Sequence, residues 1–208
     1  MDARSCTAAA CRTPANPGLP RAIATEHPAM PLIRSIGNVP GLGQVASVTS
    51  DRGLVCIEYH AWAGQVPIRH RRDAIAPGAH PVSEALLRHL EAYVFGRCRD
   101  FPIACDFSGL PPLHRAALEE ARKVPYGETR TYAAIAARIP NGTAPVVRDA
   151  LARNPLPIVI PCHRAVDEGH IGAFNGPLAT KRSLLAIEGS AAARLPDPPP
   201  GSTSRIGR

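Results

Sequence analysis

The sequence predicts two folded units in series: a small α/β unit with an antiparallel sheet and a helix, then a mostly helical unit. Three observations support this division. Strand-prone runs lie before residue 60, helical apolar spacing dominates after residue 110, and a segment containing Pro and Gly connects the two regions. We expect the units at 31–108 and 109–189, between flexible tails at 1–30 and 190–208.

The first unit is predicted from two strand-prone runs and one amphipathic helix. Residues 44–49 and 54–59 are joined by Ser-Asp-Arg-Gly, which is typical of a hairpin turn. Apolar residues then recur at helical spacing after Ser83, and Gly96 stops this helix. The sheet is therefore expected to be small and antiparallel, with one helix following it.

The second unit is predicted to begin with three helices. Pro111 and Pro112 are suited to the first turn of a helix, and Thr131 is a suitable N-cap for a short one. A further helix is expected at 143–153. The last two helices, separated by a turn containing Gly, suggest a helix-turn-helix, although many pairs of core helices share this pattern.

Composition and charge limit the function classes. The 208 residues are 45% hydrophobic and 20% charged, which is ordinary for a chain that buries a core. The net charge of +7 is compatible with nucleic-acid binding, but 22 of the 24 basic residues are Arg, so compositional bias explains it as well. No apolar run approaches the length of about 18 residues that a membrane helix needs. We expect a soluble, cytoplasmic protein without a membrane partner, associated with the nucleoid if bacterial.

One of the six cysteines differs from the others in its surroundings. No C-x-x-C pair is present, so a zinc knuckle is not expected, and a disulfide framework is not expected in an intracellular chain of this length. Cys162 follows a predicted buried strand at 158–160 and precedes His163, while a final helix is expected at 178–188. A thiol needs a base to become a nucleophile, but adjacent side chains point apart, so contact requires a bend or a bridging water. A buried structural cysteine is the alternative.

Four segments together resemble a known family. They are V-P-Y-G-E-T-R-T-Y at 124–132, N-P-L-P at 154–157, I-V-I-P-C-H-R-A-V at 158–166, and G-x-I-G-A-F-N-G-P-L-A-T-K-R-S-L-L-A-I-E-G at 169–189. In this order they resemble the O6-alkylguanine-DNA alkyltransferases, the methylated-DNA–protein-cysteine methyltransferases. The resemblance is specific from about 110 to 189 and looser from 32 to 109.

The resemblance implies a stoichiometric repair reaction on double-stranded DNA by a monomer that needs no cofactor. Cys162 would take the alkyl group of O6-alkylguanine from a base flipped out of the duplex, and would be inactivated. Whether O4-alkylthymine is also a substrate is left open by the resemblance. His163 would be the base, acting through a water, and Glu188 would orient it. Tyr132 would help to extrude the nucleotide and donate a proton to the departing guanine. Asn154 would brace the turn that holds the cysteine.

The resemblance also implies how the base and the duplex are held. Groups at Ala165, Phe174 and Asn175 would contact the flipped base; Phe174 stands where the family often has Tyr. The expected DNA contacts are Thr131, Tyr132, Pro145, Val146, Arg148 and Arg164. No metal is expected, because Val55 stands where a zinc-binding member has His.

Each role has a plainer alternative when its residue is taken alone. Tyr132 is compatible with a core aromatic, and Asn154 with an ordinary turn residue before proline. Glu188 suits a solvated helix end. Arg164 suits either a phosphate contact or a solvent-facing side chain, and the sequence does not decide between them.

The predicted recognition helix departs from the family pattern. An Arg near its start normally fills the gap left by the flipped guanine, but here Pro145 or Val146 occupies that position. Either could act as an apolar wedge. Arg148 is a doubtful substitute, and Asp149 adds a negative charge beside the phosphates. These changes put binding and extrusion in question, but not the chemistry of transfer.

Two other functions remain open on sequence grounds. An alkyltransferase-like protein binds and flags alkylguanine without accepting the group; Cys162 argues against it, whereas the missing Arg favours it. A plain helix-turn-helix regulator is a third hypothesis, but it leaves Cys162, His163 and Glu188 without a common purpose.

Overall fold

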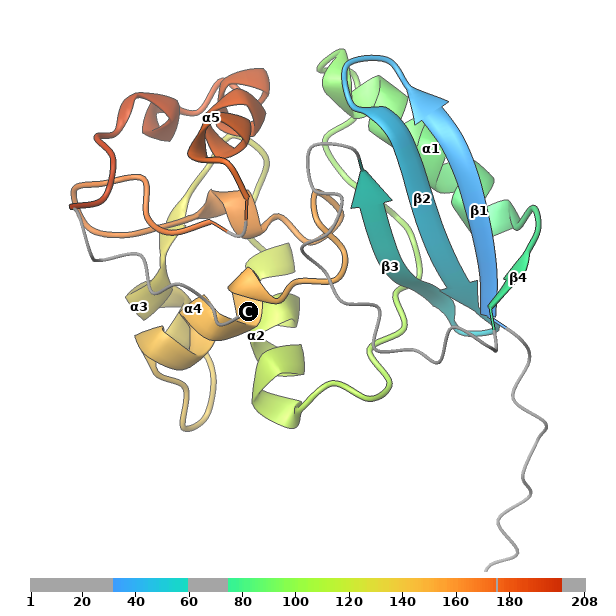
Figure 1. Cartoon of the computed structure of the whole chain (residues 1–208). Coiled ribbons are helices and arrows are strands. Elements are labelled where there is room, and N and C mark those ends of the chain that lie inside the picture. The colour runs from blue at the N-terminus through green and yellow to red at the C-terminus, as the bar shows by residue number, and fades with distance from the viewer. Residues whose placement is uncertain (1–31, 60–74, 175, 200–208) are drawn as a thin grey trace, which may run out of the picture.

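The computed structural model of the chain describes residues 32–59, 75–174 and 176–199. The elements of the first half are β1 (Leu32–Val39), β2 (Gly43–Ser50), β3 (Gly53–Tyr59), β4 (Ile75–Pro77) and α1 (Pro81–Val94). Those of the second half are α2 (Pro112–Arg122), β5 (Arg130–Thr131), α3 (Tyr132–Ala136), α4 (Ala144–Ala152), the 3₁₀ helix η3 (Cys162–Arg164), β6 (Ala165–Val166), α5 (Leu178–Ile187) and the 3₁₀ helix η4 (Ala191–Arg194). Figure 1 shows the sheet and α1 on one side of the molecule and the other α-helices on the opposite side.

The sheet of the first half has the strand order β3-β2-β1-β4. The predicted hairpin is confirmed, because Ser50 pairs with Gly53 at the antiparallel β2–β3 junction. The prediction of a purely antiparallel sheet is wrong, since β4 pairs in parallel with β1. This three-residue edge strand contains Pro77, which lacks the N–H that an inner strand would need. Its brevity left no strand signal in the sequence.

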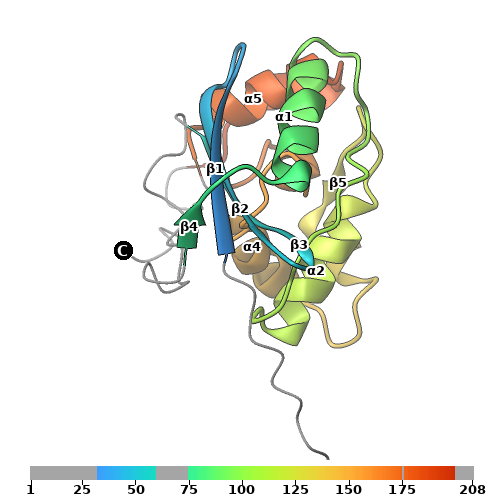
Figure 2. The ribbon, with the colours of Figure 1, turned by 90° about the vertical axis from the view of Figure 1, so that its right-hand side faces the viewer.

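Helix α1 packs against one face of this sheet (Figure 2). It begins at Pro81, three residues before the predicted start after Ser83, because the His80 side chain accepts a hydrogen bond from Val82 N at 3.2 Å. Its buried face carries Leu86, Leu90 and Tyr93. Tyr93 is fully buried, and its hydroxyl donates a hydrogen bond to Glu188 in the second half of the chain.

The predicted helices of the second half are present with small shifts in their ends. Helix α2 opens at Pro112, and the Thr131 hydroxyl caps α3 by accepting from Ala134 N at 3.1 Å. Helices α3 and α4 pack on each other, and Ile135 and Val147 are fully buried between the elements of this half. Helix α5 ends one residue early, and Gly189 follows it with φ of +70°, as a C-terminal stop requires.

The prediction of a buried strand at 158–160 is wrong. The segment is a tight buried turn closed by a bridge between Pro157 and Ile160. Ile158 has φ of +71°, a left-handed conformation that is unfavourable for a β-branched residue. Pro157 and Pro161 have no N–H to donate to a neighbouring strand. The Asn154 side chain instead forms hydrogen bonds with the backbone of Leu156 and Ile160.

The two halves share one hydrophobic core. Strand β3 faces the helical half in Figure 1, and Ile57 N donates to Pro155 O at 2.9 Å across the boundary. The predicted connection at 98–109 also runs along β3, where Leu54 N donates to Ala104 O and Asp106 N donates to Leu54 O, both at 2.8 Å. The helical half is therefore held against the sheet by backbone bonds as well as by apolar contacts.

The expectation of a flexible tail from residue 190 is wrong for its first part. Ala192 of η4 is buried, and Ile171 N donates to Pro196 O at 2.9 Å. Arg182 binds Ala193 O at 2.7 Å and Asp197 at 2.6 Å. Nothing in the sequence indicated these contacts, because this Pro-rich segment shows no helical spacing of apolar residues. The tails predicted at 1–30 and 200–208 lie outside the described residues.

Candidate functional site

Cys162 is the first residue of η3 and lies directly after the Ile158 turn. Only 5% of its surface is exposed, and its N–H donates to Ile160 O at 2.8 Å. Burial raises the pKa of the Cys162 thiol, while a hydrogen bond from Asn154 and the positive charge of Lys181 act in the opposite direction. The thiol is rigidly placed, and it needs a base before it can react.

Asn154 bonds across the turn that precedes Cys162. Its Nδ2 donates to Ile160 O at 2.8 Å, and its Oδ1 accepts from Leu156 N at 3.0 Å. Because it closes the turn from inside and also bonds to the thiol, one amide fixes both the backbone and the sulfur.

His163 provides a buried base next to the cysteine in sequence. Its side chain is fully buried, and Nε2 lies 2.7 Å from Glu188 Oε1. The carboxylate can only accept, so Nε2 carries the proton and Nδ1 keeps its lone pair. Nδ1 has no hydrogen-bond partner among the described residues. Burial lowers the pKa of His163 despite the opposing effect of Glu188, so the imidazole is neutral and able to accept a proton.

The Glu188 carboxylate also accepts hydrogen bonds from three other parts of the chain. Tyr93 of α1 donates to Oε1 at 2.7 Å, Arg164 donates to Oε2 at 3.0 Å, and Gly127 N donates to Oε2 at 3.2 Å. Burial alone would raise the pKa of Glu188, but the hydrogen bonds and charges of His163 and Arg164 lower it to about 2. The carboxylate is therefore ionised and cannot rotate freely. The alternative of a solvated helix end is excluded.

Arg164 does not occupy the position expected for a DNA contact. It is 5% exposed, pairs with Glu188 and donates to Val124 O through Nη1. Neither a phosphate nor bulk solvent can reach a guanidinium held in this way. The two predictions for Arg164, a phosphate contact and a solvent-facing side chain, are therefore both wrong. It compensates the buried charge of Glu188.

Lys181 and Tyr93 are site residues that sequence reasoning missed. Lys181 is fully buried, and its Nζ donates to the carbonyls of Ala165 at 2.6 Å and Ala173 at 3.1 Å. Burial lowers the pKa of Lys181 to about 7. One signal was available: only two lysines stand among 24 basic residues, so a lysine retained here is unusual. Tyr93 gave no signal, because its spacing is that of a core residue.

Tyr132 lies beneath an ion pair at the edge of the site. Its hydroxyl donates to Ala173 O at 2.8 Å, and the Arg148 guanidinium lies 4.5 Å from its ring centroid. Arg148 binds Asp167 through two hydrogen bonds of 2.7 and 2.5 Å. Burial raises the pKa of Tyr132, so the phenol stays protonated. Arg148 is thus already engaged by a carboxylate, which weakens its role as a free DNA contact.

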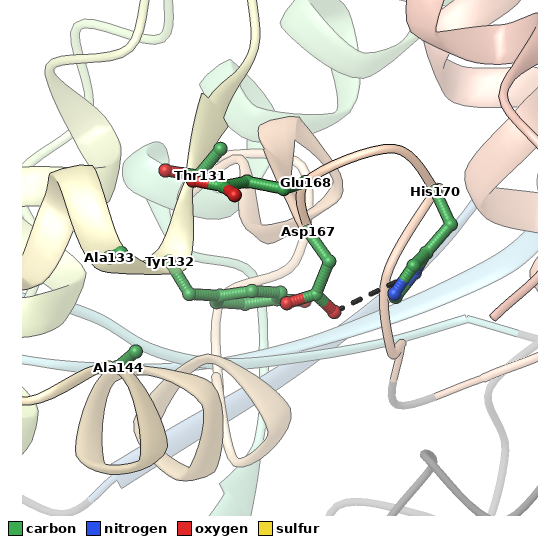
Figure 3. Close-up of a pocket in the computed structure, with 7 residues that line it drawn as sticks. All are labelled: Thr131, Tyr132, Ala133, Ala144, Asp167, Glu168 and His170. Carbon is green, nitrogen blue, oxygen red and sulfur yellow. Dashed lines mark ion pairs between the residues drawn. The ribbon is translucent and has the colours of Figure 1, made fainter. Parts of the chain in front are cut away.

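A pocket of about 290 Å³ opens beside Tyr132 (Figure 3). Its lining residues are Thr131, Tyr132, Ala133, Ala144, Asp167, Glu168 and His170. Asp167 Oδ2 lies 3.8 Å from His170 Nδ1, and the dashed line in Figure 3 marks this pair. Two of the residues expected at the DNA face, Thr131 and Tyr132, therefore lie together at one concave surface.

The other predicted contacts lie near this surface but not in its lining. Pro145 is exposed and Val146 half-buried in the first turn of α4. Ala165 is fully buried in β6, and its carbonyl already accepts from Lys181. The Phe174 ring lies 5.8 Å from Lys181 Nζ. Asn175 lies outside the described residues.

The geometry defines a class of protein: one with a buried cysteine, a neutral histidine held by a carboxylate, and a pocket at two short packed helices. A family model described as the DNA-binding domain of 6-O-methylguanine DNA methyltransferase matches residues 112–190. A methylated-DNA–protein-cysteine methyltransferase of Methanopyrus kandleri is 41% identical over 113 residues, which cover 53% of this chain and 83% of that relative.

Other relatives match over a smaller share of their length. A protein of the same name from Methanothermobacter thermautotrophicus is 37% identical over 50% of this chain, which spans 60% of that relative. The crystal structure of Mycobacterium tuberculosis O6-methylguanine methyltransferase has a TM-score of 0.62 and 26% identity, and the match covers 79% of this chain and 95% of that one. The chain belongs to the methylated-DNA–protein-cysteine methyltransferase family. No described helix is long and apolar enough to cross a membrane.

Proposed function

We propose that the protein repairs DNA by transferring the alkyl group of O6-alkylguanine to Cys162, once per molecule. The observation that carries this proposal is a buried thiol at Cys162, followed in sequence by a buried His163 whose Nε2 lies 2.7 Å from Glu188 Oε1. A base of this kind can take the thiol proton and so produce the thiolate that attacks the alkyl carbon. Family membership supplies the substrate class.

The proposed step balances as a displacement at carbon. The Cys162 sulfur forms a bond to the alkyl carbon as the C–O6 bond breaks, and the bonding electron pair stays on guanine. The thiol proton passes through a water to His163 Nδ1. Guanine takes a proton from the Tyr132 hydroxyl, and the proton held by His163 restores the phenol through solvent. The products are a thioether and an unmodified guanine, and no cofactor is consumed.

The duplex is proposed to lie against α3 and α4, acting as a helix-turn-helix. The capped start of α3, the exposed Pro145 and the pocket beside Tyr132 support this placement. Pro145 and Val146 would act as an apolar wedge in the stack instead of an arginine. The unit from 109 to 189 would carry both the DNA face and the acceptor, in the cytoplasm where the DNA is held.

A lesion-binding protein that flags alkylguanine without accepting it is the second candidate. Two observations favour it. The chain lacks the usual arginine at the start of α4, and the nearby Arg148 is bound to Asp167 in this structure. Extrusion of the base is the step that this arrangement would slow, while the thiol and its base remain complete.

The test is to mix the full-length protein with a duplex containing one O6-methylguanine and to measure intact and peptide masses. We expect one methyl group per protein on the peptide containing Cys162, and none in Cys162→Ala, which should still bind the duplex. Cys105→Ala is the matched control and should transfer normally. Selective binding without a mass gain would move the protein to the lesion-binding class. Methylation of Cys162→Ala would refute the assignment.

A further inference from the structure

Tyr93 connects the first half of the chain to the base of the acceptor site. Its ring is fully buried, between Phe101 at a centroid distance of 5.6 Å and Tyr126 at 6.2 Å. Its hydroxyl donates to Glu188 Oε1 at 2.7 Å and lies 3.4 Å from His163 Nε2. A phenol that served only to fill the core would not need a carboxylate partner, and Phe would suffice.

The oxygen that Tyr93 contacts is the one that holds the base. Glu188 Oε1 accepts from Tyr93 and from His163 Nε2, both at 2.7 Å, whereas Oε2 accepts from Arg164 at 3.0 Å and Gly127 N at 3.2 Å. Arg164 Nη2 also reaches Oε1, at 3.0 Å. Oε1 thus accepts hydrogen bonds from residues of α1 and η3 at the end of α5. Each additional donor weakens the interaction of this oxygen with its other donors.

We propose that Tyr93 is a positioning residue for the acceptor reaction: its hydroxyl fixes Glu188 so that His163 keeps its proton on Nε2 and presents Nδ1 toward the thiol. The proposal rests on the proposed function and extends it, because it makes the first half of the chain part of the acceptor site. Without the hydroxyl, one restraint on the orientation of the Glu188 carboxylate disappears.

Loss of the hydroxyl also changes the electrostatics in a defined direction. The charged or titratable groups around the pair are Tyr93 from α1, Tyr126 from the loop after α2, Cys162 and Arg164 from η3, and Lys181 from α5. With one donor fewer, Glu188 attracts the imidazolium more strongly, so the pKa of His163 rises. Transfer needs neutral His163 and is lost as the imidazole takes a proton. The acid limb of the pH–rate profile should therefore move to higher pH.

The experiment compares Tyr93→Phe with Tyr126→Phe in the full-length protein, using the O6-methylguanine duplex over a pH series. Tyr126 is the matched control, because its hydroxyl donates to Ile187 O at 2.9 Å and not to the carboxylate. In Tyr93→Phe we expect the plateau rate to fall about tenfold and the acid midpoint to rise by roughly half to one pH unit. Tyr126→Phe should keep the wild-type midpoint. Equal midpoints in all three proteins, or equal shifts in both variants, would overturn the proposal.

A second measurement does not depend on transfer. The imidazole ¹⁵N chemical shifts of His163 report which nitrogen carries the proton, and wild type should show the Nε2–H tautomer. Tyr93→Phe should show protonation of the imidazole at a higher pH than in wild type. An Nδ1–H tautomer in wild type overturns the inference even if the variant does not fold. If wild type transfers no methyl group, the proposed function fails, while these shifts still decide the role of Tyr93.

Discussion

Arg148 and Asp167 form a two-pronged ion pair that lies over the ring of Tyr132. The guanidinium is 4.5 Å from the ring centroid, and its two nitrogens reach the two carboxylate oxygens at 2.7 and 2.5 Å. The pair joins α4 to the loop after β6 at the edge of the pocket. In the proposed complex with DNA, this pair engages the one arginine of α4, Arg148, which lies near the position of the missing recognition residue.

Releasing Arg148 should strengthen binding to DNA. Asp167→Asn removes a negative charge and frees the guanidinium, so we expect the affinity for a plain duplex to rise about threefold to tenfold. The slope of log K against log salt should become steeper by about one. Glu168→Gln is the matched control, because it removes an exposed charge of the same pocket without freeing Arg148. If both variants gain equally, the ion pair does not restrain Arg148.

Removing the charge of Glu188 should destabilise the protein. Glu188→Gln leaves the Arg164 guanidinium buried without a carboxylate, and breaking a buried pair in this way costs about 3 to 5 kcal/mol. Urea unfolding monitored by circular dichroism measures the difference. Glu119→Gln, which breaks an exposed pair with Arg115, should change the free energy of unfolding by less than about 1 kcal/mol. A loss no larger in Glu188→Gln than in the control would contradict the buried network.

Lys181 should make stability depend on pH in the range above neutrality. Its pKa is about 7 in the folded protein and about 10.4 in an unfolded chain, so between these values the unfolded chain binds the extra proton. The free energy of unfolding should therefore rise with pH from about 7 to 9, with a slope approaching 1.4 kcal/mol per pH unit.

Lys181→Met is the variant that isolates this contribution. The comparison uses slopes and not absolute stabilities, because the substitution also leaves the carbonyls of Ala165 and Ala173 without their donor. Urea titrations at several pH values should give a smaller slope in the variant over the same range. Identical slopes in wild type and Lys181→Met would show that the amine keeps its ordinary pKa in the folded protein.

Truncation should separate the described part of the C-terminal segment from the remainder. A chain ending at residue 189 loses the buried Ala192, the Ile171–Pro196 bond and both partners of Arg182, and we expect a loss of about 2 kcal/mol or more. A chain ending at residue 199 keeps these contacts and serves as the control. Thermal unfolding of the two chains gives the comparison; equal midpoints would mean that η4 contributes nothing to stability.

Several parts of the fold could be predicted because their signals are local. The Ser-Asp-Arg-Gly turn, the Thr131 cap and the Gly189 stop each depend on the conformation of a few neighbouring residues, and the structure contains all three. The turn at 157–160 could not be predicted in this way. Its apolar, β-branched residues favour a strand locally, and the Asn154 side chain overrides that preference from outside the segment.

By itself, the sequence determined that a cysteine, a histidine and a glutamate occur in the order of an alkyl-acceptor family, and that helices precede and follow them. Only the tertiary structure decided which groups surround them. Arg164 is buried against Glu188 instead of facing DNA, Lys181 lies at the thiol, and Tyr93 reaches the carboxylate from the other half of the chain. The physical reason is that hydrogen bonds between buried polar groups join residues far apart in sequence, and no local pattern encodes their partners.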